Sequence, residues 1–217
     1  MQAVQIAKAM NGTPIKLLWS REDTTRHGFY RPPNLSRLRG AIDSDGDIVG
    51  WEHRIVTPTS WVSLGQIGAV RLPYSIPNML VDLVVKPCHV PEGLMRAVGL
   101  TAHGFFTQCF MDELARAVGV DSYRFQRALL DPEKVPATKS KPGKISPRAS
   151  VARFRAVLDE AAQKSNWDRP LDQNRGRGIA ALSYANAFFA AVAEVTSMRK
   201  GGSALIAWLS LPIPDCS

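Results

Sequence analysis

Residues 90–115 read VPEGLMRAVGLTAHGFFTQCFMDELA, and the rest of the chain is organised around this stretch. It begins as a glycine-containing loop with one arginine, Arg96, and continues without a proline break into apolar residues at helical spacing. The spacing predicts a helix with four residues on its buried face: Phe106, Cys109, Phe110 and Leu114. The charged residues of the same helix fall elsewhere on its surface: Asp112, Glu113 and Arg116.

The junction between this loop and the helix is open to two interpretations. The first turn of a helix leaves backbone N–H groups unpaired, so these donors and the Arg96 guanidinium could together bind an anionic ligand. The alternative is an ordinary helix start beside a surface arginine. The residues of the junction alone do not decide between the two.

The composition fits a folded protein. The chain has 217 residues, 45% of them hydrophobic, which is enough for a core in one large domain or two small ones. A net charge of +8 raises the question of nucleic acid or acidic membranes as partners, but the charge is spread along the chain. Residues 1–100 carry 11 basic and 8 acidic side chains, and the remainder carries 16 and 11.

The densest basic run, residues 134–155, lies in an interval rich in proline, serine and glycine and has no aromatic residue before Phe154. This composition favours a solvated linker over a surface on which bases stack. We therefore expect no nucleic-acid partner. A non-catalytic basic module that binds an acidic partner or nucleic acid is kept as the alternative function.

The cysteines and the apolar segments exclude several protein classes. Cys88, Cys109 and Cys216 are odd in number and far apart, which argues against a disulfide framework and a paired-cysteine metal site. A reducing compartment fits them, although the residues do not identify the compartment. We expect no membrane span and no secretory signal within this chain, because no apolar run is long enough.

The first third of the chain predicts a helix, a strand and a hairpin. Apolar spacing predicts a helix over residues 2–10, and because the chain opens inside it we expect residues upstream. Residues 14–19, PIKLLW, have the pattern of a short buried strand. Residues 35–42 and 48–56 alternate on either side of DSDGD and predict an antiparallel hairpin. A turn explains this acidic run without calcium, since no glutamate closes the loop.

The remainder predicts further strands and helices. Residues 79–85 form a strand, Gly119 ends the central helix, and Asp121 caps the helix that follows. Residues 150–165 predict an amphipathic helix with four inward residues: Phe154, Val157, Leu158 and Ala161.

The C-terminal apolar segments are less determined. Residues 179–195 form either separate strands or a strand with a turn at residues 184–186, and the pattern leaves this open. Residues 204–214 start as a strand, which we expect Pro212 and Pro214 to end.

Common catalytic motifs are absent from the sequence. There is no GxSxG, P-loop or HExxH, and GRGIA after Arg175 lacks the third glycine of a nucleotide-binding loop. The histidines lie in different predicted elements, and we expect all four to be ordinary polar or surface residues rather than ligands: His27, His53, His89 and His103. The sequence thus argues against these common catalytic families, and its motifs identify no other.

The order of several segments carries a resemblance that no single motif does. PIKLLWSREDTTRHGFYRP is followed by a hairpin ending in GWEHRIV, then YSIPN, VPEGLMRAVG, FFTQCFMDELA and GRGIA. This order, over residues 1–195, resembles the molybdopterin-binding large subunit of the xanthine dehydrogenase and aldehyde oxidase family. The branch it resembles is that of the isoquinoline 1-oxidoreductase beta subunit.

The resemblance implies an α+β fold, a fragment of the molybdopterin-binding domains with mixed sheets and packed helices. It implies part of a first domain at 1–131, a basic linker at 132–147, and the truncated start of a second domain at 148–217. The implied enzyme oxidises aldehydes or hydroxylates aromatic N-heterocycles with oxygen from water. Its implied cofactor is molybdopterin with molybdenum, in the cytosine dinucleotide form, and its implied partner is a small [2Fe–2S] subunit.

The resemblance also assigns site residues. Arg96 and Val98 match positions beside the family's substrate pocket, and Gly99 matches a glycine near the cofactor. Two positions depart from the family pattern: Ala102 stands where a glutamine is usual, and Gln108 where a glutamate is usual.

Two further family segments have no counterpart here. A glycine-rich loop would precede Met1, and the segment with the catalytic glutamate would follow Ser217. We therefore expect no catalytic residue and no metal ligand within this chain. We expect an internal fragment that is inactive in isolation.

Overall fold

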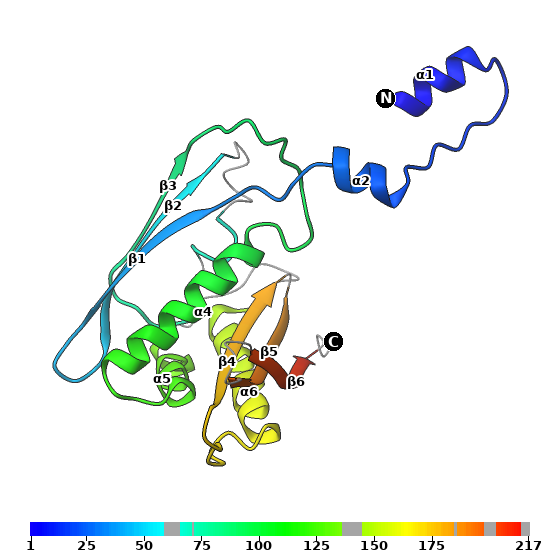
Figure 1. Ribbon diagram of the computed structural model, residues 1–217. Coiled ribbons are helices and arrows are strands. Elements are labelled where there is room, and N and C mark those ends of the chain that lie inside the picture. The colour runs from blue at the N-terminus through cyan, green and yellow to red at the C-terminus, as the bar shows by residue number, and fades with distance from the viewer. Residues whose placement is uncertain (59–65, 71, 136–144, 185, 198–202, 214–217) are drawn as a thin grey trace.

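The structure is a computed structural model that describes residues 1–58, 66–70, 72–135, 145–184, 186–197 and 203–213. The first two helices, α1 (Gln2–Ala9) and α2 (Arg21–His27), form an arm that extends away from the rest (Figure 1). Neither helix has a buried residue. The predicted N-terminal helix is confirmed, and Ser20 begins α2 by accepting a hydrogen bond from the Asp23 N–H at 3.1 Å.

The first sheet contains β1 (Leu35–Ile42), β2 (Ile48–Thr57) and β3 (Met79–Val85) in that order. β1 and β2 form the predicted antiparallel hairpin, and β3 lies parallel to β2. In the turn, Asp43 Oδ1 accepts hydrogen bonds from the N–H groups of Asp45 and Asp47, at 3.0 and 2.9 Å. The acidic residues thus close a turn, as the sequence predicts.

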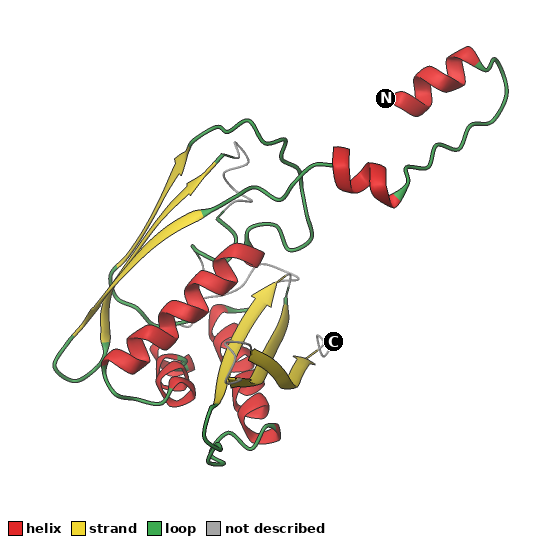
Figure 2. Ribbon diagram, in the orientation of Figure 1, coloured by secondary structure: helices red, strands yellow, loops and turns green. Residues whose placement is uncertain are grey.

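Helix α4 (Leu100–Ala117) lies between the two sheets of the protein (Figure 2). On one side, Phe110 meets Trp51 of β2 edge to face, with ring centroids 5.0 Å apart. On the other side, Gly104 faces Leu182, and a Cβ at Gly104 would lie 3.0 Å from Leu182 Cδ1. A side chain at Gly104 would therefore require the Leu182 side chain of the second sheet to shift.

The end of α4 is set as predicted. Gly119 has φ +70°, its N–H donates to the Arg116 carbonyl at 3.1 Å, and the Val120 N–H donates to the Ala115 carbonyl at 3.0 Å. These two bonds close a Schellman turn, which favours glycine at the left-handed position. Asp121 then caps α5 (Ser122–Leu129) by accepting from the Arg124 N–H at 3.0 Å.

The second sheet contains β4 (Arg175–Tyr184), β5 (Ala187–Ser197) and β6 (Ser203–Ile213), all antiparallel. Helix α6 (Pro147–Lys164) packs against this sheet, and a short 3-10 helix, η1 (Pro132–Lys134), follows α5. The hairpin of β4 and β5 decides between the two alternatives for residues 179–195. These residues lie in two strands, β4 and β5, and Asn186, with φ +70°, directly precedes β5.

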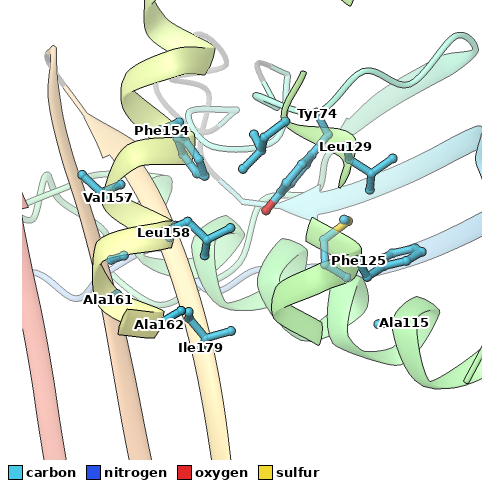
Figure 3. Packing of buried hydrophobic residues seen from close by; sticks show 14 of the residues in the cluster. Tyr74, Ala115, Phe125, Leu129, Phe154, Val157, Leu158, Ala161, Ala162 and Ile179 are labelled. Atoms are coloured by element: carbon cyan, nitrogen blue, oxygen red, sulfur yellow. The ribbon is translucent and has the colours of Figure 1, made fainter. Parts of the chain in front are cut away.

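One hydrophobic core joins α4, α5, α6 and the second sheet (Figure 3). The four inward residues predicted for α6 are all buried: Phe154, Val157, Leu158 and Ala161. They pack with Phe125 and Leu129 of α5 and with Ile179 of β4. This burial, rather than helix propensity, holds α6 on the sheet.

Three predictions about individual elements are wrong. Residues 14–19 are not a strand: they have no regular structure and their Leu18 and Trp19 side chains are exposed, because no strand in the described ranges lies beside them. Pro212 does not end the last strand, since β6 continues to Ile213 with Pro212 opposite Phe189. A proline fits there because the described sheet ends at β6, whose far edge needs no backbone donor.

The predicted buried face of α4 is also misplaced. Leu114 is buried, but Cys109 is exposed and Phe106 and Phe110 are only half-buried. The buried face instead includes three polar residues: His103, Thr107 and Gln108. A helix between two sheets buries two flanks, and hydrogen bonds allow polar residues to occupy one of them.

The predicted division at 131 and 147 remains a prediction. Most of its linker, residues 136–144, lies outside the described residues. Among the helices of the described ranges, none has the length and hydrophobicity that crossing a membrane requires.

Candidate active-site loop

The loop that precedes α4 is attached to residues 29–30, which follow the arm. The Tyr30 N–H donates to the Pro91 carbonyl at 2.9 Å, and the Gly93 N–H donates to the Tyr30 carbonyl at 3.0 Å. These bonds form a parallel bridge between Tyr30 and Glu92. Phe29 covers Gly93 so closely that a Cβ at the glycine would lie 2.7 Å from Phe29 Cβ. The start of the loop is therefore fixed against residues 29–30.

The end of the loop is fixed by Arg31. Its Nη1 donates to the Val98 carbonyl at 3.1 Å and its Nη2 donates to the Arg96 carbonyl at 3.0 Å. Ala97 lies between the two residues whose carbonyls are bound and has φ +63°. Val98, which carries the second carbonyl, has φ +43°. Both residues lie in the left-handed region, which is costly for a residue with a Cβ and more so for β-branched valine.

The residues assigned by the resemblance lie together at this junction. Arg96 is exposed, Val98 is half-buried, and Gly99 is buried directly before the first turn of α4. Gly99 has the helical angles φ −65° and ψ −26°, so its position does not require glycine's left-handed freedom. The predicted loop-to-helix junction is thus present, and its strained residues are Ala97 and Val98.

Two polar features accompany the exposed guanidinium. Within the described ranges, Glu92 Oε2 is a buried atom with no hydrogen-bond partner. Thr101 Oγ1, in the first turn of α4, donates to the Arg96 carbonyl at 3.4 Å. The loop therefore offers a cation beside the first turn of the helix and, at its start, an unused buried acceptor.

The family departure at Gln108 has a structural role. Gln108 Nε2 donates to Tyr74 Oη at 3.0 Å, and Gln108 Oε1 accepts from the Ala181 N–H of β4 at 3.1 Å. Tyr74 Oη donates in turn to Gln126 Oε1 at 3.0 Å. An amide can donate and accept at once, so Gln108 joins α4 to both β4 and α5 through buried bonds.

Two of the four histidines are not surface residues. His53 of β2 and His103 of α4 are both fully buried, and their ring centroids are 5.2 Å apart in an edge-to-face contact. His53 Nε2 is 2.9 Å from Ser36 Oγ of β1. Burial, and then the charge of His103, lower the pKa of His53 from 6.5 to about 4. Of the two possibilities predicted, a polar or a surface position, this pair takes the first: both rings are buried polar groups that meet where α4 packs on β2.

Some of the basic side chains are paired with acidic neighbours. Several arginines form ion pairs at the surface, among them Arg54 with Asp82 at 2.7 Å. In the second sheet, Arg177 and Arg169 each approach Glu194 to 2.8 Å, and the Arg177 guanidinium stacks on Trp167. Paired arginines do not form the free basic surface on which nucleic-acid binding depends.

The described residues contain no group of three or more His, Cys, Asp or Glu side chains that could hold a metal ion. Cys88 and Cys109 are exposed free thiols. Sequence reasoning missed Arg31, the His53–His103 pair and the Gln108 network. Arg31 lies 67 positions before Val98, and no local pattern links residues at such a separation.

Comparison with known proteins identifies the family. The sequence model of the molybdopterin cofactor-binding domain matches residues 1–129, which is more than half of the chain. The chain belongs to the molybdopterin cofactor-binding domain family. The family resemblance carried by the order of the segments is thereby confirmed.

Relatives of this family have similar sequences along most of the chain. The isoquinoline 1-oxidoreductase subunit beta of Brevundimonas diminuta is 26% identical over 90% of the chain and 25% of its own length. The xanthine dehydrogenase molybdenum-binding subunit of Escherichia coli is 23% identical over 91% of the chain and 28% of its own length. The chain thus spans about a quarter of the length of these relatives.

A solved structure shares the fold. The aldehyde oxidoreductase from Desulfovibrio desulfuricans matches with a TM-score of 0.54 and 19% identity, over 93% of this chain and 24% of the other. The α+β class predicted from the sequence, with mixed sheets and packed helices, is confirmed.

Proposed function

We propose that this chain is part of the large subunit of a molybdenum hydroxylase that oxidises aldehydes or hydroxylates aromatic N-heterocycles with oxygen from water. The support is its membership of the cofactor-binding family, together with the names of its relatives. Those relatives are an isoquinoline 1-oxidoreductase subunit and a xanthine dehydrogenase subunit. Both names denote oxidation of a nitrogen heterocycle.

In this proposal the loop before α4 forms one wall of the substrate pocket. Arg96 and Val98 face the substrate, and the backbone at Gly99 approaches the cofactor. The observation that carries the assignment is the fixed, left-handed backbone at Ala97 and Val98, directly beside an exposed guanidinium. Strain of this kind is retained where the surroundings fix a residue in place for a function.

The polar groups of the loop fit molybdopterin in its cytosine dinucleotide form. Such a cofactor carries ring N–H groups, which match the unpaired Glu92 Oε2 acceptor, while Arg96 is left for the substrate. The chemistry that the molybdenum group supplies when bound is the two-electron oxidation of the substrate, with the electrons passing to a small [2Fe–2S] partner subunit. The part of this chain is to position the substrate and the cofactor.

Arg96 has a defined electrostatic role in such a pocket. A guanidinium stays protonated at all working pH values, so it can stabilise negative charge that develops on a heterocycle or a carbonyl oxygen. Its effect depends on the exclusion of water, because a dry site strengthens each charge interaction. Val98 supplies an apolar contact on the same wall.

We further propose that the isolated chain does not turn over. Arg96 and its neighbours Leu94 and Met95 are exposed, so the described residues leave the loop open to solvent. A charge-stabilising group in water contributes little to an oxidation that needs a dry pocket. Other parts of the parent enzyme would have to cover this wall.

The test compares the chain with the complete subunit. Both are purified from cells that also express cofactor assembly factors, and molybdenum is measured per mole of protein. We expect little molybdenum in the isolated chain and a stoichiometric amount in the complete subunit. Stoichiometric metal with turnover in the isolated chain would contradict its proposed inactivity.

Site-directed change tests the proposed pocket. Arg96→Ala in the complete subunit should lower kcat/KM about 100-fold, as expected for loss of a fixed charge donor, with the molybdenum content unchanged. Arg116→Ala, at an exposed arginine of α4 outside the proposed pocket, is the matched control. Filter binding of DNA at two salt concentrations tests the alternative function, and salt-sensitive retention would favour it.

A further inference from the structure

We propose that Arg31 is a positioning residue that holds the Arg96 loop in its strained conformation and so sets the direction of the Arg96 and Val98 side chains. The functional meaning of this inference rests on the proposed function of the loop. Its structural content does not, because Arg31 contacts only the protein backbone in the hydrogen bonds that define it.

The two hydrogen bonds determine the backbone on both sides of Ala97. Arg31 binds the carbonyl before Ala97 and the carbonyl two positions later, at 3.0 and 3.1 Å. Each bound carbonyl orients its own peptide plane, 96–97 or 98–99, and together they restrain the φ and ψ angles of Ala97 and Val98, which lie between these planes. The Cα–Cβ directions of Arg96 and Val98 then follow relative to α4.

The backbone that is held would not choose this conformation unaided. Ala97 and Val98 both have positive φ, a region that L-residues with a Cβ rarely occupy. Without the hydrogen bonds of Arg31, these two residues gain most by relaxing to the ordinary β or α regions. Such relaxation would rotate the Arg96 carbonyl away and redirect its side chain.

Arginine suits this role better than lysine. Its planar guanidinium presents N–H groups that diverge in a fixed plane, so one side chain can bind two carbonyls at once. An ammonium is a compact charge on a flexible stem and binds without fixing orientation. The backbone that carries Arg31 is restrained as well, because the neighbouring Tyr30 is paired with Pro91 and Gly93 at the start of the loop.

The position of Arg31 separates this role from a general contribution to stability. It lies between β1 and the arm, and the helices of the arm contribute no buried residue. The hydrophobic core lies with the helices and sheets beyond the arm. Loss of Arg31 should therefore loosen the loop without unfolding the core.

The test measures amide hydrogen exchange by mass spectrometry on the full 217-residue chain. The variants are Arg31→Ala and Arg31→Lys, with Arg26→Ala, an exposed arginine of α2, as the matched control. The informative peptides contain Val98 and Leu100, whose N–H groups donate within the loop to Met95 and Ala97, at 3.1 and 2.9 Å. Peptides of α6 report on the core.

We expect exchange in the loop to rise about tenfold or more in both Arg31 variants, since each hydrogen bond from a charged donor is worth about that factor. The α6 peptides, the melting temperature and the Arg26 variant should keep their original values. Methylguanidinium at millimolar concentration should restore part of the protection in Arg31→Ala, because it can donate to the same two carbonyls. No such rescue follows if Arg31 acts only by filling space.

Two results would overturn the inference: unchanged exchange in the loop of Arg31→Ala, or an equal rise in the loop and in α6. In the complete holoenzyme, Arg31→Lys should lower kcat more than it raises KM, with the molybdenum content unchanged. Normal turnover in Arg96→Ala would overturn the proposed function alone, because the exchange measurements do not depend on turnover. The two proposals therefore fail in distinguishable ways.

Discussion

Acidification should destabilise the protein through the buried pair of His53 and His103. His53 is fully buried between β1, β2 and α4, next to Ser36 and edge to face with His103. Burial disfavours its charged form, the charge of His103 disfavours it further, and together they lower the pKa of His53 to about 4. The folded protein thus keeps His53 neutral at a pH where the unfolded chain protonates it.

The sign and size of the effect follow from linkage. Between pH 6.5 and pH 4 the unfolded state binds more protons at this residue, so the free energy of unfolding falls as the pH falls. At pH 5 an unfolded histidine of pKa 6.5 is almost wholly protonated, whereas a folded one of pKa about 4 is about one-tenth protonated. The resulting loss from pH 7.5 to pH 5 is about 2 kcal/mol.

Urea denaturation at pH 7.5, 6 and 5 measures this loss. The comparison is between the original protein and His53→Gln, which keeps a side chain able to bind Ser36 but cannot titrate. Contributions from carboxylates are common to both proteins and cancel in the difference between their pH slopes. His89→Gln, at an exposed histidine, is the matched control for the same change of residue type.

The change of stability with pH, rather than the absolute stability of a variant, reports the titration of His53. We expect the original protein to lose about 2 kcal/mol more than His53→Gln between pH 7.5 and pH 5. Parallel slopes for the two proteins would refute it. So would a midpoint of the extra loss at or above pH 7, since His53 must titrate below its ordinary pKa.

Three substitutions test the packing around α4 and α6. Gln108→Leu should lower the free energy of unfolding by about 2 kcal/mol, because it leaves the buried Ala181 N–H unpaired. The control Gln163→Leu, at an exposed site, should change the free energy of unfolding little in the same urea titration. Gly40→Ala should cost about 1–3 kcal/mol by thermal melting, since its Cβ would lie 2.7 Å from Leu114 Cδ2; an unchanged melting temperature would contradict this packing. Phe154→Ala should cost about 3–4 kcal/mol or leave the chain unfolded by circular dichroism, and a loss below 1 kcal/mol would show that the core is not centred on α6.

Most secondary structure was predictable because its signals are local. The hairpin around DSDGD, the Gly119 helix end and the Asp121 cap each depend on residues a few positions apart. The strand predicted for residues 14–19 was wrong because an apolar run is buried only where other residues cover it. None of the described residues covers this run. Helix α2 had a signal that was overlooked, since Ser20 and Asp23 have the spacing of a capping box.

The sequence by itself determined the family, the order of most elements and the placement of Arg96, Val98 and Gly99 at a loop that enters a helix. The ordered segments were enough for this, since a family pattern is a property of the chain. Only the tertiary structure brought Arg31 to the carbonyls of residues 96 and 98 and His53 to His103. The physical reason is that a hydrogen bond or ring contact between residues 50 to 67 positions apart depends on how helix and sheet pack, and no local spacing encodes it.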